Sequence, residues 1–156
     1  MKGHILIIDD EHSILETLEM FVSEKGHTAH TADSGQKGLD QYDRCDPDVV
    51  ILDIRLPDVS GFELLCDIQR RENPAKVIMI TAFQDMETTI KAMKLGAYDY
   101  IHKPLDADKV EKAVNRALQT LKVDRETPLL DELTQPPNPE VIIGKSDQMR
   151  KIFKMI

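Results

Sequence analysis

Several features are absent or scarce in this sequence. It contains no tryptophan and only two cysteines. No apolar run approaches the roughly 20 residues needed to span a bilayer. The opening MKGHILIIDD reaches acidic residues too early for a secretory signal peptide. Cys45 and Cys66 form no CxxC pair and have no histidine at metal-ligand spacing, so we predict reduced, structural thiols. These absences exclude disulfide scaffolds and membrane spans, and we expect a cytoplasmic protein.

Positive charge is also in deficit. Twenty Lys and Arg face 28 Asp and Glu, which gives a formal net charge of -8 at pH 7. This balance opposes general affinity for phosphate backbones, which needs clustered basic residues. The 41% apolar and 31% charged content over 156 residues instead indicates one well-packed globular domain followed by a tail. We therefore expect this chain to bind neither nucleic acid nor a membrane.

Short runs rich in Ile and Val alternate with stretches of helical periodicity. The strand candidates are 4–9, 27–32, 48–53, 76–81 and 98–102, and the helical stretches are 14–22, 35–42, 62–68, 86–93 and one beginning near Asp106. The third and fourth runs are apolar on both faces, which is typical of a parallel sheet covered on both sides. The pattern predicts an α/β fold, a doubly wound five-stranded parallel sheet with five helices.

The last predicted helix carries a second pattern. Asp106 is a suitable N-cap, and the helix is predicted to run past the domain to about Glu126. Heptad spacing along one side of it would suit a parallel helix pair, so we predict a homodimer through this helix and its extension. The residues at that spacing are Val110, Val114, Ala117 and Leu121. Alternatively they all pack onto the domain's own sheet, since two heptads are too few to specify a coiled coil.

Proline marks the end of the domain. Of the eight prolines, Pro128, Pro136, Pro137 and Pro139 fall close together. We predict a domain over 1–122, an extended helix end and Pro-rich linker over 123–139, and the truncated start of another domain over 140–156. The sequence Gly144-Lys145-Ser146 is not a phosphate-binding loop, because proline stands at position 139, where that motif needs glycine.

Polar side chains collect at the predicted ends of the strands. Asp9 and Asp10 follow the first strand, Asp53 ends the third, Thr81 ends the fourth and Lys103 follows the fifth. In open parallel sheets, ligands bind beyond these carboxyl ends. Three carboxylates brought together repel one another unless a cation lies among them, and Mg²⁺ suits because it takes few carboxylates and bridges to phosphate oxygens. We predict Asp10 and Asp53 as direct ligands and Asp9 as a ligand through water.

The same residues suit phosphoryl transfer. Asp53 can act as a nucleophile toward phosphorus if the metal and Lys103 stabilise the phosphoryl oxygens. The hydroxyl of Thr81 can donate to one of these oxygens and so report whether the group is present. The sequence therefore predicts a phosphorylation switch.

This ordered set resembles the receiver domains of two-component response regulators over residues 1 to about 122. The resemblance is carried by Asp9-Asp10, Asp53 closing VVILD, Thr81-Ala82 and Lys103-Pro104, and the segment DIRLPDVSGFELL strengthens it. It implies a flavodoxin-like receiver fold and a partner sensor histidine kinase that donates a phosphoryl group to Asp53.

The resemblance also assigns roles to individual residues. It implies that Asp9 and Asp10 hold Mg²⁺, with the backbone carbonyl of Arg55 as a further ligand, and that Lys103 contacts the phosphoryl oxygens. Thr81 would move toward those oxygens, and Tyr100 matches the family's switch aromatic. A cis peptide bond is expected before Pro104.

The tail carries a shorter resemblance. The segment IIGKSDQMRKIF is similar to the opening of the AAA+ ATPase domain in NtrC-like activators that work with sigma-54 polymerase. It implies that AAA+ and DNA-binding domains of the same parent chain lie beyond Ile156. Phosphorylation would then regulate that activator, most simply through a rearranged dimer.

Three other functions compete with the switch. A phosphatase of the haloacid dehalogenase type needs a second Asp two residues after the nucleophile, where this chain has Arg55, so we predict a signalling switch and not an enzyme. A flavodoxin-like site would need donors for a flavin phosphate where this crevice is acidic. A phosphorylation-independent interaction module remains the alternative, although its expected sign, loss of an acidic pocket residue or of the lysine, is absent. We predict no chemistry for the five histidines.

Overall fold

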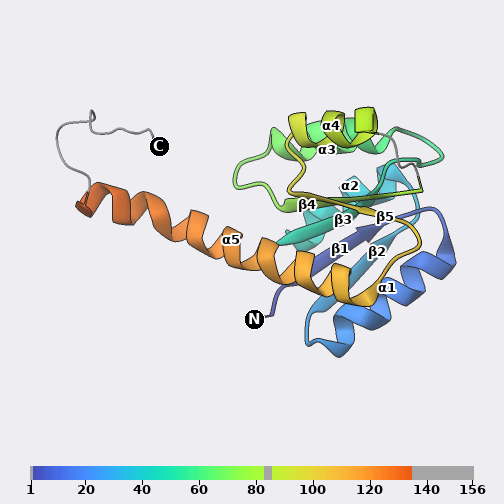
Figure 1. The fold of residues 1–156 in the computed structure, drawn as a ribbon, viewed down its shortest axis with the longest axis horizontal. Coiled ribbons are helices and arrows are strands. Elements are labelled where there is room, and N and C mark those ends of the chain that lie inside the picture. Colours follow the sequence, from blue (N-terminus) through green and yellow to red (C-terminus); the bar gives the residue numbers. More distant parts are fainter. Residues whose placement is uncertain (1, 83–85, 135–156) are drawn as a thin grey trace. The chain divides into compact units, whose positions relative to one another are not determined.

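The computed structural model describes residues 2–82 and 86–134, with side chains up to residue 124 (Figure 1). Strands and helices alternate along the chain as predicted. They are β1 (His4–Ile8), α1 (His12–Glu24), β2 (Thr28–Ala32), α2 (Gly35–Cys45), β3 (Val49–Asp53), α3 (Gly61–Gln69), β4 (Lys76–Thr81), α4 (Met86–Lys94), β5 (Asp99–His102) and α5 (Ala107–Thr134). Four of the predicted strands were one residue too long at one end.

All five strands are parallel, in the order β2-β1-β3-β4-β5. The chain places β2 on one side of β1 and then crosses to place β3 on the other. The loops that follow β1 and β3 consequently leave toward opposite faces of the sheet. A crevice opens at such a reversal of strand order, beyond the carboxyl ends of the strands.

Successive strand residues feed two separate cores. Ile5 and Ile7 of β1 pack with α1 and α5, whereas Leu6 and Ile8 pack on the side of α2, α3 and α4. Figure 1 shows the same division, with α1 and the first part of α5 below the sheet and α3 and α4 above it. Burial of both faces explains why the strands read as continuous apolar runs, and it confirms the predicted doubly wound architecture.

Short polar side chains fix the starts of several helices. The Ser34 hydroxyl accepts the Lys37 N–H of α2 at 3.2 Å, and the Ser60 hydroxyl accepts the Phe62 N–H of α3 at 3.1 Å. The Asp106 carboxylate accepts the Asp108 N–H at 2.9 Å, which confirms the predicted N-cap of α5.

Helix α5 departs from the sequence prediction in two respects. The four residues at heptad spacing are buried, and Val110, Val114 and Ala117 pack in the core between the sheet and helices α1 and α5. They therefore follow the alternative interpretation, in which these residues pack onto the domain's own sheet. The helix also ends at Thr134 rather than near Glu126. Proline inside a helix fixes a compatible φ but removes one backbone donor and crowds the preceding turn, and the helix continues past Pro128 through LLDEL, in which Leu and Glu are strong helix formers.

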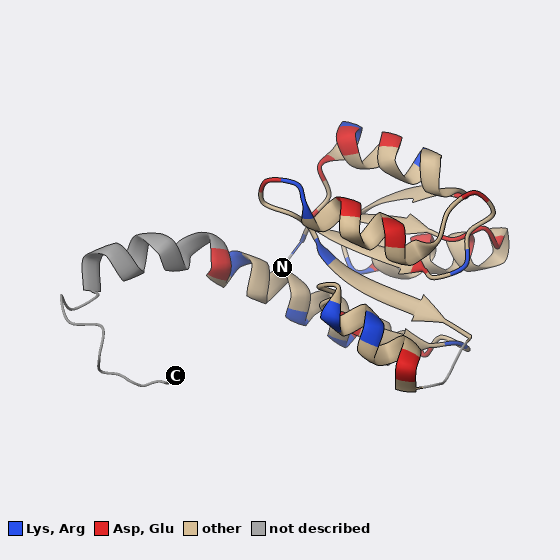
Figure 2. Cartoon of the chain, turned by 90° about the horizontal axis from the view of Figure 1, so that it is seen from above, with Lys and Arg blue, Asp and Glu red and all other residues tan. Residues whose placement is uncertain are grey.

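The chain divides into two compact units after Lys122. The predicted prolines of the linker, Pro136, Pro137 and Pro139, and the segment 140–156 lie outside the described residues. Acidic and basic side chains are interspersed over the helices up to residue 124 (Figure 2). Within the described part of the chain, none of the helices combines the length and the apolar character that crossing a bilayer requires.

Candidate functional site

Four strands deliver polar side chains to one edge of the sheet. Asp9 follows β1, Asp53 closes β3, Thr81 closes β4, and Lys103 follows β5. The register brings these ends level, because Asp53 pairs with Ile80 and Thr81 pairs with the residue before Lys103. Asp9, Asp53 and Thr81 are all buried, although their side chains are polar. Buried polar groups require partners, and Asp9 and Asp53 find theirs in Lys103 and in nearby backbone N–H groups.

The ammonium of Lys103 is the positive centre of the site. Its Nζ lies 3.1 Å from Asp9 Oδ2, 3.0 Å from Glu11 Oε1 and 3.4 Å from Asp53 Oδ2. Burial by itself would lower the pKa of Lys103, but the surrounding carboxylates of Glu11, Asp53 and Asp9 more than reverse this and raise it above its usual range. The lysine is therefore a permanent cation in the crevice.

Opposing effects act on the pKa of the Asp53 carboxyl group. Burial, and then the nearby charge of Asp9, raise its pKa to about 6, while Lys103 and the Arg55 N–H pull it down. The Arg55 N–H donates to Asp53 Oδ1 at 3.4 Å. Above pH 6 the group is ionised but poorly compensated, which is the state of a carboxylate that gains from a further positive charge.

The carboxylates offer a place for that charge. One oxygen from each of Asp9, Asp10 and Asp53 lies within 4.8 Å of the other two. Asp9 Oδ1 accepts the Glu11 N–H at 2.9 Å, whereas the buried Asp9 Oδ2 is paired with the Lys103 ammonium at 3.1 Å but accepts no well-formed hydrogen bond within the described residues. A buried carboxylate oxygen without a well-formed hydrogen bond, beside two further carboxylates, fits a hard, oxygen-liganded cation such as Mg²⁺.

The loop after β3 folds back over the end of the strand at Asp53. The Gly61 N–H donates to the Ile54 carbonyl at 2.7 Å, and Arg55 forms a bridge with Ser60. A Cβ at position 61 would lie 2.3 Å from the Asp53 carbonyl oxygen, so only glycine fits this approach. The chain thus holds Arg55 close to Asp53, and the role of its carbonyl as a metal ligand remains a prediction.

Comparison with known proteins gives this arrangement a family. The model of the response regulator receiver domain matches residues 5–115. The chain belongs to that family. The receiver fold and the sequence resemblance are thereby confirmed, and the chain is a signalling switch module rather than an ordinary enzyme. Receiver domains have a phospho-accepting regulatory role and bind Mg²⁺ through acidic residues of the kind gathered here.

The chain is similar to parts of longer regulatory proteins. It is 37% identical to the nitrogen assimilation regulatory protein NtrX of Azorhizobium caulinodans over 155 residues, which cover 97% of this chain and 33% of that one. It is 36% identical to the regulatory protein AtoC of Escherichia coli over 124 residues, 80% of this chain and 27% of that one. The crystal structure of NtrX from Brucella abortus superposes with a TM-score of 0.80 at 33% identity and covers 90% of this chain and 32% of that one. The chain thus spans about a third of the length of these relatives.

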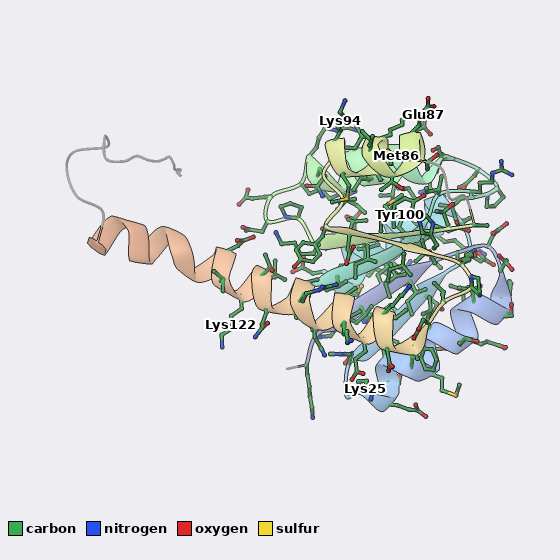
Figure 3. The ribbon with its side chains drawn as sticks, viewed as in Figure 1. Lys25, Met86, Glu87, Lys94, Tyr100 and Lys122 are labelled. Carbon is green, nitrogen blue, oxygen red and sulfur yellow. The ribbon has the colours of Figure 1, made fainter. Side chains whose placement is uncertain are left out.

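Two further receiver residues were predicted to change position with phosphorylation. Thr81 is buried at the end of β4, and its carbonyl accepts the Lys103 N–H at 2.7 Å. Tyr100 lies on β5, partly buried, below α4 in the view of Figure 3, with its ring edge-on to His102 at a centroid distance of 5.0 Å. The Lys103-Pro104 peptide bond is cis, as expected. The switching roles of Thr81 and Tyr100 stay predictions.

Two residues of the site were not found from the sequence. No role was predicted for Glu11 from the sequence, yet its carboxylate contacts Lys103. Asp58 was not singled out, yet its two oxygens accept the N–H groups of Gly35 at 2.8 Å and Gln36 at 2.9 Å and join the β3–α3 loop to α2. The available signals were the continuous triplet Asp9-Asp10-Glu11 and the acidic residue two positions before the Ser60 cap.

Proposed function

We propose that Asp53 accepts a phosphoryl group from a sensor histidine kinase in a magnesium-dependent reaction. The observation that carries this proposal is the position of the buried Asp53 carboxylate, 3.4 Å from the Lys103 ammonium and next to the carboxylates of Asp9 and Asp10. An anionic acceptor flanked by a fixed cation and a cation-binding trio is suited to receive a phosphoryl group.

Each residue then has a task in the transfer. An Asp53 oxygen attacks phosphorus, the bond from phosphorus to the donor histidine nitrogen breaks, and its electron pair stays on that nitrogen, which takes up a proton. Lys103 donates to the phosphoryl oxygens as their charge develops. Asp10, Asp53 and the Arg55 carbonyl would hold Mg²⁺ directly and Asp9 through water. The metal would supply further positive charge beside the same oxygens.

The output of the switch is a changed protein contact. Thr81 would donate its hydroxyl to a phosphoryl oxygen, and Tyr100 would respond on the neighbouring strand. Next to them, α4 exposes apolar side chains, with Met86 75%, Ile90 45% and Met93 46% exposed (Figure 3). An exposed apolar stripe beside the switch residues supports a role in binding a protein partner.

The proposed target is a sigma-54-dependent activator in the same parent chain. In support, the similarity to NtrX extends over 155 residues and so reaches the tail that resembles an AAA+ opening. The proposed boundaries remain 1–122, 123–139 and 140–156, and we place the protein in the cytoplasm.

A homodimer through α5 would have to use residues other than the buried heptad positions, such as Val123, which is 58% exposed.

Intact-mass measurement tests the central proposal. The chain is incubated with Mg²⁺ and acetyl phosphate, beside Asp53→Asn and beside a sample with excess chelator. We expect a gain of about 80 Da, the mass of one phosphoryl group, only in the unmodified sequence with Mg²⁺. If none of the samples gains mass although Mg²⁺ binds, the domain is a phosphorylation-independent interaction module and the roles of Thr81 and Lys103 are withdrawn.

A further inference from the structure

The three carboxylates around Lys103 differ in what else they do. Asp9 and Asp53 are buried and belong to the trio that fits a cation. The Glu11 side chain is 55% exposed and stands outside that trio. The Glu11 carboxylate contacts the site through an ion pair with the Lys103 ammonium. This ion pair spans 3.0 Å, compared with 3.1 Å for Asp9 and 3.4 Å for Asp53. Glu11 therefore contacts the phosphoryl-binding lysine without holding the metal.

From this contact we infer that Glu11 restrains phosphoryl acceptance by occupying Lys103 in the unphosphorylated receiver, an inference that rests on the proposed function. An ammonium has three N–H donors. A phosphoryl group on Asp53 brings three strong acceptor oxygens and a charge of about -1.5 to -2. Lys103 has to turn donors toward these oxygens, and the Glu11 carboxylate competes with them for one of its three donors.

Repulsion acts in the same direction. Glu11 and Asp53 both lie within 3.4 Å of one nitrogen, so the Glu11 charge stands close to the incoming anion. Because Glu11 is exposed, solvent weakens this repulsion to the range of a surface pair. Asp9 and Asp53 keep Lys103 in place when Glu11 is neutral. Glu11 is thus a positioning residue that acts through Lys103, and its charge slows transfer about two- to fivefold.

The test compares phosphorylation rates at saturating Mg²⁺. Glu11→Gln removes the charge and keeps the shape of the side chain. Glu16→Gln, on the exposed side of α1, makes the same charge change away from the lysine and serves as the matched control. With acetyl phosphate and intact-mass readout, we expect Glu11→Gln to react about two- to fivefold faster than the unmodified sequence. Glu16→Gln should react at the unmodified rate.

Two readouts separate this role from a fold defect. The advantage of Glu11→Gln should shrink as salt is added, because salt screens exposed charges. In the magnesium-free protein, the ¹⁵N NMR signal of the Lys103 ammonium should shift in Glu11→Gln and stay in place in Glu16→Gln. A third variant, Glu11→Asp, keeps the charge but shortens the side chain, and should give an intermediate rate.

The outcomes distinguish the two proposals. If the unmodified chain gains the phosphoryl mass but Glu11→Gln reacts no faster, or the Lys103 signal does not move, the inference about Glu11 is wrong and the proposed function stands. If the unmodified chain gains no mass, the proposed function fails, and the inference fails with it.

Discussion

At the scale of single residues, burial and charge repulsion disfavour the ionised form of Asp53. Asp53 is buried beside Asp9, and the Lys103 ammonium does not fully compensate it, so the pKa of Asp53 rises to about 6 from an ordinary 3.8. A carboxyl group with a raised pKa in the folded state binds its proton more tightly there than in the unfolded chain. Stability contributed by the neutral form is present below about pH 4 and is lost as the pH rises through about 6.

Asp53→Asn should therefore stabilise the magnesium-free receiver at neutral pH. The amide has a similar shape and no charge to bury. Two pKa units correspond to about 2.7 kcal/mol in the free energy of unfolding, and because solvent screens part of this effect we expect a gain on the order of 2 kcal/mol. The gain should be complete at pH 7.5 and nearly absent near pH 4, where the native carboxyl is neutral. Urea denaturation at both values, with EDTA present, measures it.

The control for this prediction is Asp10→Asn. Asp10 is exposed, so neutralising it should stabilise the protein less than neutralising Asp53. Saturating Mg²⁺ should stabilise the native sequence and close part of the gap to Asp53→Asn, because ligand binding to the folded state adds stability. Equal stabilities of Asp53→Asn and the native sequence at pH 7.5 without metal would show that burial does not strain this carboxylate.

At the scale of elements, the β3–α3 loop determines where the proposed phospho-acceptor Asp53 points. Asp58 fastens the loop to the start of α2 through the Gly35 and Gln36 N–H groups, and these donors lower the pKa of the Asp58 carboxyl. Gly61 brings the start of α3 against the end of β3. The loop is thus fixed at both ends to regular elements, which favours a preorganised site.

Gly61→Ala should disturb this loop strongly. The added Cβ would lie 2.3 Å from the Asp53 carbonyl oxygen and 2.7 Å from Ile54 Cα, and backbone atoms cannot rotate away as a side chain can. We expect a loss of about 1–3 kcal/mol in the free energy of unfolding, the usual cost of overpacking. We also expect a slower gain of phosphoryl mass, because Asp53 is displaced.

Gly38→Ala is the matched control for that change. Its added Cβ would meet the Ile8 side chain, which can shift, and alanine favours the α2 helix by about 1 kcal/mol over glycine. Its cost should be clearly smaller than that of Gly61→Ala. A loss in Gly38→Ala that equals or exceeds that of Gly61→Ala would argue against the close approach at position 61.

At the scale of the whole molecule, the residues that build the two cores all precede residue 123. Both cores are built from residues up to Leu118, and the division into units falls after Lys122. The cores cover both faces of a complete five-stranded sheet. A domain of this size with its own core is expected to fold by itself.

A chain ending at Lys122 should therefore keep the properties of the receiver. We expect a cooperative thermal transition within about 5 °C of that of the 156-residue chain, since a change of 1 kcal/mol moves such a midpoint by about this amount. Its phosphorylation rate by acetyl phosphate should be unchanged. Calorimetry and intact mass check both points, and a chain that unfolds non-cooperatively would place essential contacts beyond Lys122.

The alternation of strands and helices, the two-sided sheet and the set of residues at its carboxyl edge could all be predicted from the amino-acid sequence. This was possible because apolar periodicity is local, and because parallel topology brings the carboxyl ends of the strands together. Asp9, Asp10, Asp53, Thr81 and Lys103 could be found in this way. The cap at Asp106 could also be found, since capping uses neighbouring residues.

Which of these groups touch, and which surfaces they leave exposed, depends on the folded arrangement of the elements. The Glu11 contact with Lys103 and the Asp58 bonds to α2 join segments far apart in sequence, so no local pattern encodes them. The same holds for α5, whose heptad spacing fits a helix pair as well as a sheet. In the folded domain, Val110, Val114 and Ala117 pack against the sheet, because burying them within the domain needs no second chain.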